Sequence, residues 1–275
     1  MKFGASLIIT FEEISSVEEF LAKIAKIDDI EIIELVLEPP YLSVASLNEE
    51  KIAIIRNYLK DKGLQVTIHA PFSDLNISSL NDNVRNFAIQ EIIKSIDVAS
   101  KFHSKIVTIH PGSLGAYGKS FEEEIAQKNF QSIKKLTEYA AGKNIILCLE
   151  NMPVTPWLQL EDTYNPNKIK AIIKKIDNPY LQITWDIGHS NTTSFTLEEH
   201  FIAFKDSIKH VHLHDNLGTI NGWRDTHLKI GEGTINWETI FQLLTEINYD
   251  KGLILELKSF KEIQQSLEKT KKWIK

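Results

Sequence analysis

Short apolar runs alternate with amphipathic segments along the whole chain. The runs are rich in Ile, Val and Leu and show little polar alternation, which is typical of strands buried on both faces of a parallel sheet. They occupy residues 2–9, 30–37, 64–70, 105–110, 144–150, 181–186, 209–214 and 252–257. Between them, apolar residues recur at helical spacing and predict helices that include 83–102, 121–142 and 259–275.

This alternation predicts an α/β fold, a single (β/α)₈ TIM barrel with one domain over residues 1–275. Such barrels routinely use about 250 residues, close to the length of this chain. The main alternative is a doubly wound open sheet, which a glycine-rich phosphate loop after the first strand would favour. The first apolar run leads instead into TFEE (10–13), so the sequence favours the barrel.

Composition and charge narrow the classes of function. The formal net charge is −6, so any phosphate contact must be local and cannot rest on bulk positive charge. The one cysteine, Cys148, cannot form an internal disulfide and fits a reducing compartment. No run approaches the roughly 18 apolar residues that span a bilayer, and the N-terminal residues lack a signal-peptide pattern. We therefore expect a cytoplasmic protein with no membrane partner and no obligate protein partner.

The ends of the predicted strands carry the candidate chemistry, because the active site of such a barrel lies at the carboxyl ends of its strands. Nine potential metal ligands gather there: His69, His110, Glu150, Asp186, His189, His212, Asp225, His227 and Glu256. Side chains alternate faces along a strand, so His210, His212 and His214 share a face. We expect His210 in the core, one layer below the site, and His214 at the rim, where it could touch substrate.

Each of these residues also has a structural explanation. A single strand-end histidine is more often a hydrogen-bonded structural group. Asp186 could cap a turn or helix, and Asp225 and His227 could lie in a solvated loop. Glu150 and Glu256 are harder to explain in this way, because each ends an apolar run where an unpaired carboxylate is costly. The convergence of all nine residues on one face of the barrel favours a metal centre.

Short motifs at these strand ends resemble the endonuclease IV group within the xylose-isomerase-like TIM barrels. They occur in order and cover about residues 64–257: HAPF (69–72), IHPGS (109–113), LEN (149–151), WDIGH (185–189), HLHD (212–215), DTH (225–227), IGEG (230–233) and LILEL (253–257). The resemblance implies the xylose-isomerase-like barrel and a centre of three zinc ions.

The resemblance also implies how the ligands divide among the ions. The first ion would bind His69, His110 and Glu150; Glu150 would bridge to a second, shared with Asp186, His212 and Glu256; and His189, Asp225 and His227 would bind the third. Sugar isomerases and epimerases of the same superfamily typically keep only the group of four that includes the bridging glutamate, around one divalent metal.

Charge explains why this difference matters. Four carboxylates and five neutral imidazoles with three divalent ions leave about +2, which suits an anionic phosphate. The group of four with one ion leaves about −1, which suits a neutral sugar. The mixed nitrogen and oxygen ligands fit Zn²⁺, with Mn²⁺ or Fe²⁺ also possible, and disfavour Ca²⁺ and Mg²⁺.

Substrate contacts are expected from loops above the strand ends. Phe72 and Tyr41 could stack on a base or a flipped sugar, or simply pack within their loops. Arg224 and Lys229 could contact a substrate phosphate, and Arg224 could equally bind a sugar hydroxyl. Endonuclease IV inserts side chains from the loops after strands two and three into DNA. Here the loop 38–50 contains neither arginine nor glutamine, which predicts a weaker grip on duplex DNA.

The favoured hypothesis is a metal-dependent phosphodiesterase of the endonuclease IV type that hydrolyses DNA at abasic sites. Glu150, Glu256 and His69 are its candidate catalytic residues. The alternative is a divalent-metal-dependent sugar or sugar-phosphate isomerase or epimerase, in which Glu150 and Glu256 move a proton beside the substrate carbonyl. A third class, a non-catalytic metal-binding barrel, has no specific feature of the sequence in its favour.

Overall fold

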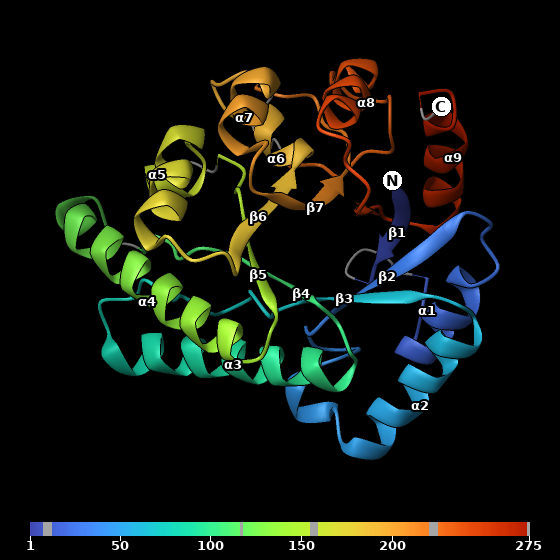
Figure 1. The fold of residues 1–275 in the computed structure, drawn as a ribbon, viewed down its shortest axis with the longest axis horizontal. Helices are drawn as coiled ribbons and strands as arrows, with labels where there is room; N and C mark the ends of the chain where they lie inside the picture. Colours follow the sequence, from blue (N-terminus) through green and yellow to red (C-terminus); the bar gives the residue numbers. More distant parts are fainter. Residues whose placement is uncertain (8–12, 116–117, 155–158, 220–224, 274–275) are drawn as a thin grey trace.

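The predicted strands close into a parallel barrel (Figure 1). The structure is a computed structural model that describes residues 1–7, 13–115, 118–154, 159–219 and 225–273. Each strand pairs in parallel with the next, and the last pairs with the first. The strands are β1 (Lys2–Ser6), β2 (Ile30–Val36), β3 (Gln65–His69), β4 (Ile106–Ile109), β5 (Ile146–Glu150), β6 (Leu181–Asp186), β7 (Ile208–Leu213) and β8 (Gly252–Leu255). The predicted (β/α)₈ barrel is confirmed.

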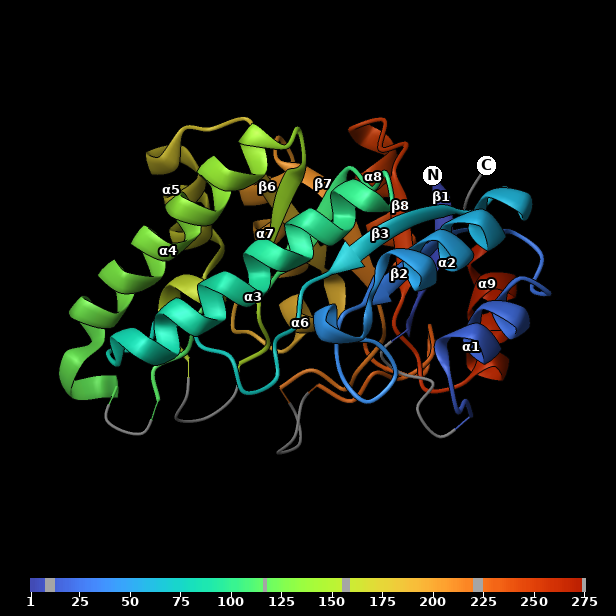
Figure 2. The same cartoon turned by 90° about the horizontal axis from the view of Figure 1, so that it is seen from below.

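Helices cover the outside of the barrel, and α3 and α4 lie side by side along one flank (Figures 1 and 2). They are α1 (Val17–Ile24), α2 (Glu49–Asp61), α3 (Asp82–Lys101), α4 (Glu122–Gly142), α5 (Pro166–Ile176), α6 (Ile187–Asn191), α7 (Leu197–Phe204), α8 (Trp237–Glu246) and α9 (Phe260–Thr270). Among the described residues, short 3₁₀ helices in the connections include Val44–Ser46, Gly118–Phe121 and Glu161–Thr163. The helix predicted over 259–275 was too long, because α9 ends at Thr270 and a turn follows.

Capping residues set where the helices begin. The Ser16 hydroxyl accepts the Glu19 backbone N–H at the start of α1, and the Asn48 side chain accepts the Lys51 N–H at the start of α2. Each cap satisfies one of the backbone donors that the first helical turn leaves unpaired. Polar residues between the apolar runs therefore fix the short connections between strands and helices.

The barrel interior changes from apolar to ionisable along its axis. Toward the amino ends of the strands the packing is tight: a Cβ at Gly4 would lie 2.5 Å from Ile254 Cδ1 and 2.7 Å from the Ile32 carbonyl oxygen. The next layer contains small polar side chains, and the hydroxyls of Thr108 and Thr184 lie 2.9 Å apart. These threonines stand two residues before His110 and Asp186, so the candidate ligands form the layer above them.

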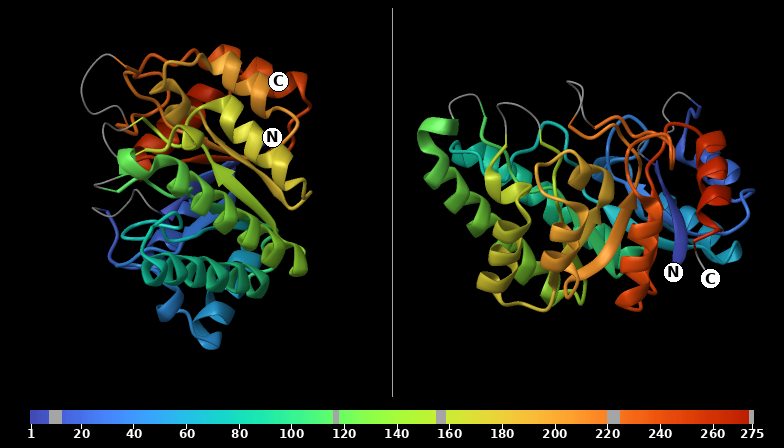
Figure 3. Two further views of the ribbon diagram at one scale, coloured as in Figure 1. Left: turned by 90° about the vertical axis from the view of Figure 1, so that its left-hand side faces the viewer. Right: turned by 90° about the horizontal axis from the view of Figure 1, so that it is seen from above.

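Both ends of the described chain lie together beside the barrel (Figure 3). Met1 and Trp273 line one surface hollow. Within the described ranges, no helix combines the length and the apolar character needed to cross a bilayer.

Candidate metal centre

The first group of candidate ligands joins the carboxyl ends of three neighbouring strands. His69 ends β3, His110 follows β4 and Glu150 ends β5. Glu150 Oε2 lies 3.2 Å from His69 Nε2 and 3.1 Å from His110 Nε2. The other ring nitrogen of His69 donates to the Ala70 carbonyl at 2.7 Å. This hydrogen bond fixes the orientation of the ring, so Nε2 faces the Glu150 carboxylate, where a proton or a cation can lie between the two atoms.

Glu150 also faces a second set of nitrogens. Its Oε1 lies 3.2 Å from His212 Nδ1 and 3.4 Å from His189 Nδ1, so this fully buried carboxylate meets four imidazoles. Burial alone would raise the pKa of Glu150, but His212 and His110 outweigh it and lower that pKa well below its usual value. An ionised carboxylate whose two oxygens face different nitrogens suits a bridge between two cations.

The second group adds Asp186, His212 and Glu256. His212 Nδ1 lies 3.8 Å from Asp186 Oδ2 and 3.5 Å from Glu256 Oε1. Asp186 also has the structural role considered from the sequence, because its Oδ1 accepts the His189 backbone N–H at 2.6 Å and caps α6. One oxygen therefore fixes the helix while the other faces the group.

The third group lies between α6 and the loop after β7. His189 Nε2 lies 3.4 Å from Asp225 Oδ2, and His227 Nε2 lies 3.2 Å from Asp225 Oδ1. The Nδ1 atoms of the two rings donate to backbone carbonyls, those of Asn151 at 2.9 Å and Glu256 at 3.0 Å. These bonds turn both Nε2 atoms toward the Asp225 carboxylate.

His214 lies within the third group, which differs from its expected place at the rim. It is fully buried, and its ring stacks on His227 with centroids 3.8 Å apart. Its Nε2 lies 3.1 Å from Asp186 Oδ1. Gly188 makes room for the ring, because a Cβ there would lie 2.0 Å from His214 Cε1. The glycine of the WDIGH motif therefore has a packing role.

The donor set fits divalent cations. Burial alone would lower the pKa of His189, but the charges of Asp186 and Asp225 raise it well above its usual value. The same competition, dominated by Asp225, raises the pKa of His227 to about 9. Protons thus neutralise the buried carboxylates in the metal-free protein, and cations would displace them. Mixed imidazole and carboxylate ligands favour Zn²⁺, Mn²⁺ or Fe²⁺ over Ca²⁺ and Mg²⁺.

Phe72, one of the expected substrate contacts, lies directly against the first group. Its ring stacks on His110 with centroids 4.6 Å apart and meets His69 edge-on at 5.4 Å. The buried Glu38 carboxylate accepts the backbone N–H groups of Phe72 and Ser73. The loop after β3 is therefore anchored beside the candidate ligands.

Other expected substrate contacts are engaged elsewhere. The Tyr41 hydroxyl donates to the Ile14 carbonyl at 2.8 Å, which fits the loop-packing explanation. The Lys229 ammonium pairs with Glu232 at 3.0 Å and donates to Gln265 at 2.9 Å. Arg224 lies outside the described residues.

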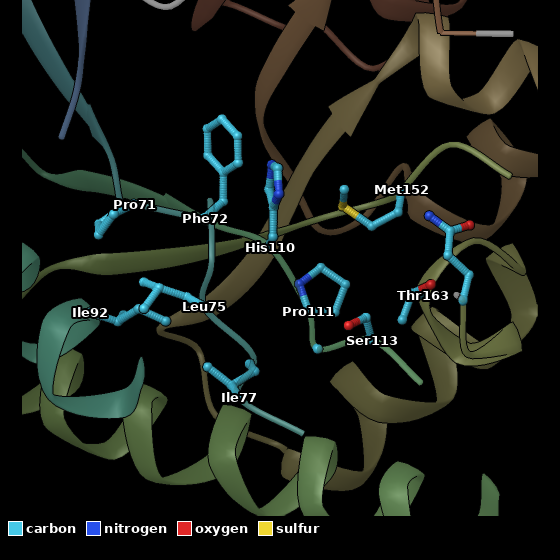
Figure 4. A pocket seen from close by; sticks show the side chains of 12 residues that line it. Pro71, Phe72, Leu75, Ile77, Ile92, His110, Pro111, Ser113, Met152 and Thr163 are labelled. Atoms are coloured by element: carbon cyan, nitrogen blue, oxygen red, sulfur yellow. The ribbon is translucent and has the colours of Figure 1, made fainter. Parts of the chain in front are cut away.

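A small cavity of about 170 Å³ opens beside Phe72 and His110 (Figure 4). Its lining combines apolar side chains with a few neutral polar ones: Pro71, Phe72, Leu75, Ile77, Ile92, Pro111 and Met152, with Ser113, Gln159 and Thr163. Among these described residues there is no Lys, Arg, Asp or Glu. The cavity therefore suits a compact neutral group beside the first group of ligands.

Two buried residues that the sequence did not single out organise the centre. The Asn151 side chain donates to the Asp186 carbonyl at 3.0 Å and accepts the Asp186 N–H at 2.9 Å, which ties β5 to β6. Glu34 of β2 lies beneath His212. Asn151 directly follows Glu150, so its position in the motif was a usable signal. The sequence held no comparable signal for Glu34. The same apolar run contains Glu31, which is exposed, and nothing in the run distinguishes the two glutamates.

Comparison with known proteins gives relatives of two named chemistries. An uncharacterised protein of Methanocaldococcus jannaschii is 33% identical over 276 residues, covering 100% of this chain and 89% of that protein. A solved structure described as a D-tagatose 3-epimerase-like protein is 32% identical, with a TM-score of 0.88 and coverage of 100% and 97% of the two chains. A protein of Mesomycoplasma hyopneumoniae named probable endonuclease 4 is 27% identical over 188 residues, covering 65% of this chain and 64% of that protein.

The family itself follows from a match to a family model over most of the chain. Residues 21–275 match the family described as the xylose isomerase-like TIM barrel. The closed barrel of eight parallel strands and the motifs at its strand ends agree with that match. This chain belongs to the xylose isomerase-like TIM barrel family.

Proposed function

We propose that this protein is a metal-dependent phosphodiesterase of the endonuclease IV type that hydrolyses DNA at abasic sites. The observation that carries the proposal is the third group, in which His189, Asp225 and His227 bring ligand atoms within 4.8 Å of one another. Three divalent ions, Zn²⁺ by preference, would lower the pKa of a water molecule and stabilise negative charge on a phosphate. One-metal sugar chemistry has no need of this additional group.

The chain's own residues divide the work. Glu150 lies between the first and second groups and orients the attacking water. Glu256, only 5% exposed, lies between His212 and His227 and is the candidate acceptor of the water's proton. His69 Nε2 faces Glu150, and its ring meets Phe72, which lines the cavity, so His69 would orient a substrate bound there. The neutral cavity beside it would accommodate the deoxyribose of an abasic site.

Charge supports a phosphate-bearing substrate. With Glu34 included, five carboxylates belong to or touch the ligand set, four of them buried and Asp225 half-buried. Three divalent ions would still leave about +1 at the barrel mouth, if the imidazoles are neutral. This local charge would attract a phosphate although the whole chain carries −6.

A divalent-metal-dependent sugar or sugar-phosphate epimerase is the second candidate. It is favoured by the relative described as D-tagatose 3-epimerase-like and by the complete group of Glu150, Asp186, His212 and Glu256. In that chemistry Glu150 and Glu256 would exchange a proton with the carbon beside the substrate carbonyl. The uncharged cavity favours a free sugar over a sugar phosphate.

Counting metals and assaying both substrate classes tests the choice. Protein stripped with chelator and reloaded with Zn²⁺ or Mn²⁺ is measured by elemental analysis, then incubated with an abasic-site duplex and with ketoses and ketose phosphates. We expect three ions per chain and chelator-sensitive cleavage of the duplex. Saturation at one ion, or sugar turnover with an intact duplex at every enzyme concentration, would overturn the proposal in favour of the epimerase.

A further inference from the structure

A fifth carboxylate lies fully buried beneath the candidate metal centre. Glu34 Oε1 lies 3.1 Å from His212 Nε2, and Glu34 Oε2 lies 2.8 Å from His210 Nε2. The Thr67 hydroxyl approaches the same Oε2 at 3.4 Å. Both oxygens of Glu34 are thus engaged by imidazoles of β7, on the far side of His212 from the second group.

This arrangement determines which nitrogen of His212 carries a proton. A neutral imidazole has one N–H and one lone pair, and an ionised carboxylate only accepts hydrogen bonds. Glu34 Oε1 and His212 Nε2 are both buried and face each other at 3.1 Å, and neither atom has a hydrogen-bond partner elsewhere among the described residues. With a cation bound at Nδ1, which faces Glu150, Asp186 and Glu256, the one proton of a neutral His212 would lie on Nε2, opposite Glu34.

His212 differs in this respect from other imidazoles of the centre. His69, His189 and His227 donate from Nδ1 to neutral backbone carbonyls and present Nε2. His212 instead faces a buried carboxylate with Nε2 and turns Nδ1 toward the second group. A hydrogen bond to an ionised acceptor is roughly twice as strong as a neutral one. A carboxylate partner also raises the basicity of a ligating imidazole.

We propose that Glu34 is a positioning residue that fixes the His212 tautomer and makes the second group the tightest of the three cation sites. His210 completes the device, because its hydrogen bond to Oε2 prevents the carboxylate from rotating away from His212. Space for His210 comes from Gly252, where a Cβ would lie 3.3 Å from the His210 ring. The inference rests on the proposed cation binding, which the phosphodiesterase and the epimerase share. If the role of Glu34 is refuted, both proposed functions still stand.

Glu34→Gln tests the inference, because the amide keeps the shape but can accept only one of the two N–H donors and has no charge. Glu31→Gln, on an exposed position of the same strand, is the matched control. Stepwise Zn²⁺ titration against a competing chelator should show the tightest binding step weakened about 10–100-fold in Glu34→Gln, with the other steps and the control near wild type. Equal affinities in wild type and Glu34→Gln would overturn the proposal.

Histidine NMR gives a readout that a merely structural role would not move. In ¹⁵N-histidine protein loaded with Zn²⁺, the His212 signals, assigned with His212→Gln, should show the Nε2–H tautomer in wild type and lose it in Glu34→Gln. Glu34→Asp keeps the charge with a shorter reach. It should recover part of the affinity, and it serves as the test if Glu34→Gln does not fold. An Nδ1–H tautomer in wild type, or a fourth ion lost on mutating Glu34, would refute the assignment.

Discussion

The strand-end layer and the loops above it are built differently. Glu150, Asp186 and His212 are essentially inaccessible to solvent, and backbone groups or buried carboxylates fix the orientation of their neighbours. In the loops, the Tyr41 hydroxyl donates to a backbone carbonyl and the Lys229 ammonium pairs with a surface carboxylate, away from the candidate ligands. The candidate metal ligands are therefore built into the barrel itself, whereas the expected substrate contacts lie on the loops above it.

The largest effect should come from the residue shared by two groups. Glu150→Gln removes the charge that faces four imidazoles, and it should reduce duplex cleavage by more than about 100-fold, since even outer-shell changes cost roughly 10–100-fold. Elemental analysis should show fewer bound ions. Lys229→Ala, in the loop, should leave both quantities within a few-fold of wild type. Equal losses in the two variants would erase the distinction between the strand-end layer and the loops.

The third group separates the two candidate chemistries within the strand-end layer. His189→Ala and His227→Ala should each remove one ion and reduce phosphodiester cleavage about 10–100-fold or more, because each deletes a nitrogen facing Asp225. Any sugar epimerisation should survive His227→Ala, since the second group stays complete. His103→Asn, an exposed histidine with positive φ, is the control. Full cleavage in both variants, with occupancy measured, would contradict the proposed mechanism.

Stability against pH should distinguish the metal-free from the metal-loaded layer. The pKa of His227 is about 9 in the folded protein and near 6.5 when unfolded, so its stabilisation is present below pH 6.5 and is lost as the pH rises through 9. Glu150 and Asp186 have lowered pKa values, so their contribution is lost only on acidification. Urea unfolding with chelator should show stability falling from pH 6.5 to 9, by up to a few kcal/mol.

With Zn²⁺ bound, this alkaline decline should disappear, because the cations replace the protons. His227→Ala without metal should flatten the decline as well. A metal-free stability that rises between pH 6.5 and 9 would show that imidazolium ions do not neutralise these carboxylates.

Most residues of the strand-end layer could be predicted from the sequence, because the two-residue period of a strand determines which side chains face the barrel interior. A buried strand places every second side chain on one face, so an acidic residue or histidine closing an apolar run points into the barrel mouth. Contacts between distant strands carry no such signal. Glu34 and His210 are 176 residues apart, and nothing near Glu34 distinguishes it from Glu31. His214 was placed at the rim because the space that Gly188 leaves for its ring is a property of packing, invisible in either segment alone.

The loops give the smallest expected effects, and Phe72 and Tyr41 sharpen the comparison among them. Phe72 presents a ring beside the first group and the neutral cavity, so Phe72→Ala should weaken duplex cleavage by about 1–3 kcal/mol, roughly 5- to 150-fold, if a base or sugar stacks there. Tyr41→Phe deletes only the hydroxyl that donates to Ile14, so it should leave cleavage unchanged and lower the free energy of unfolding by about 1 kcal/mol. Cleavage kinetics and urea unfolding of both variants decide the matter. If Tyr41→Phe impairs cleavage while stability is unchanged, the Tyr41 hydroxyl contacts the substrate. The loop after β2 would then belong to the substrate site rather than only packing beside the barrel.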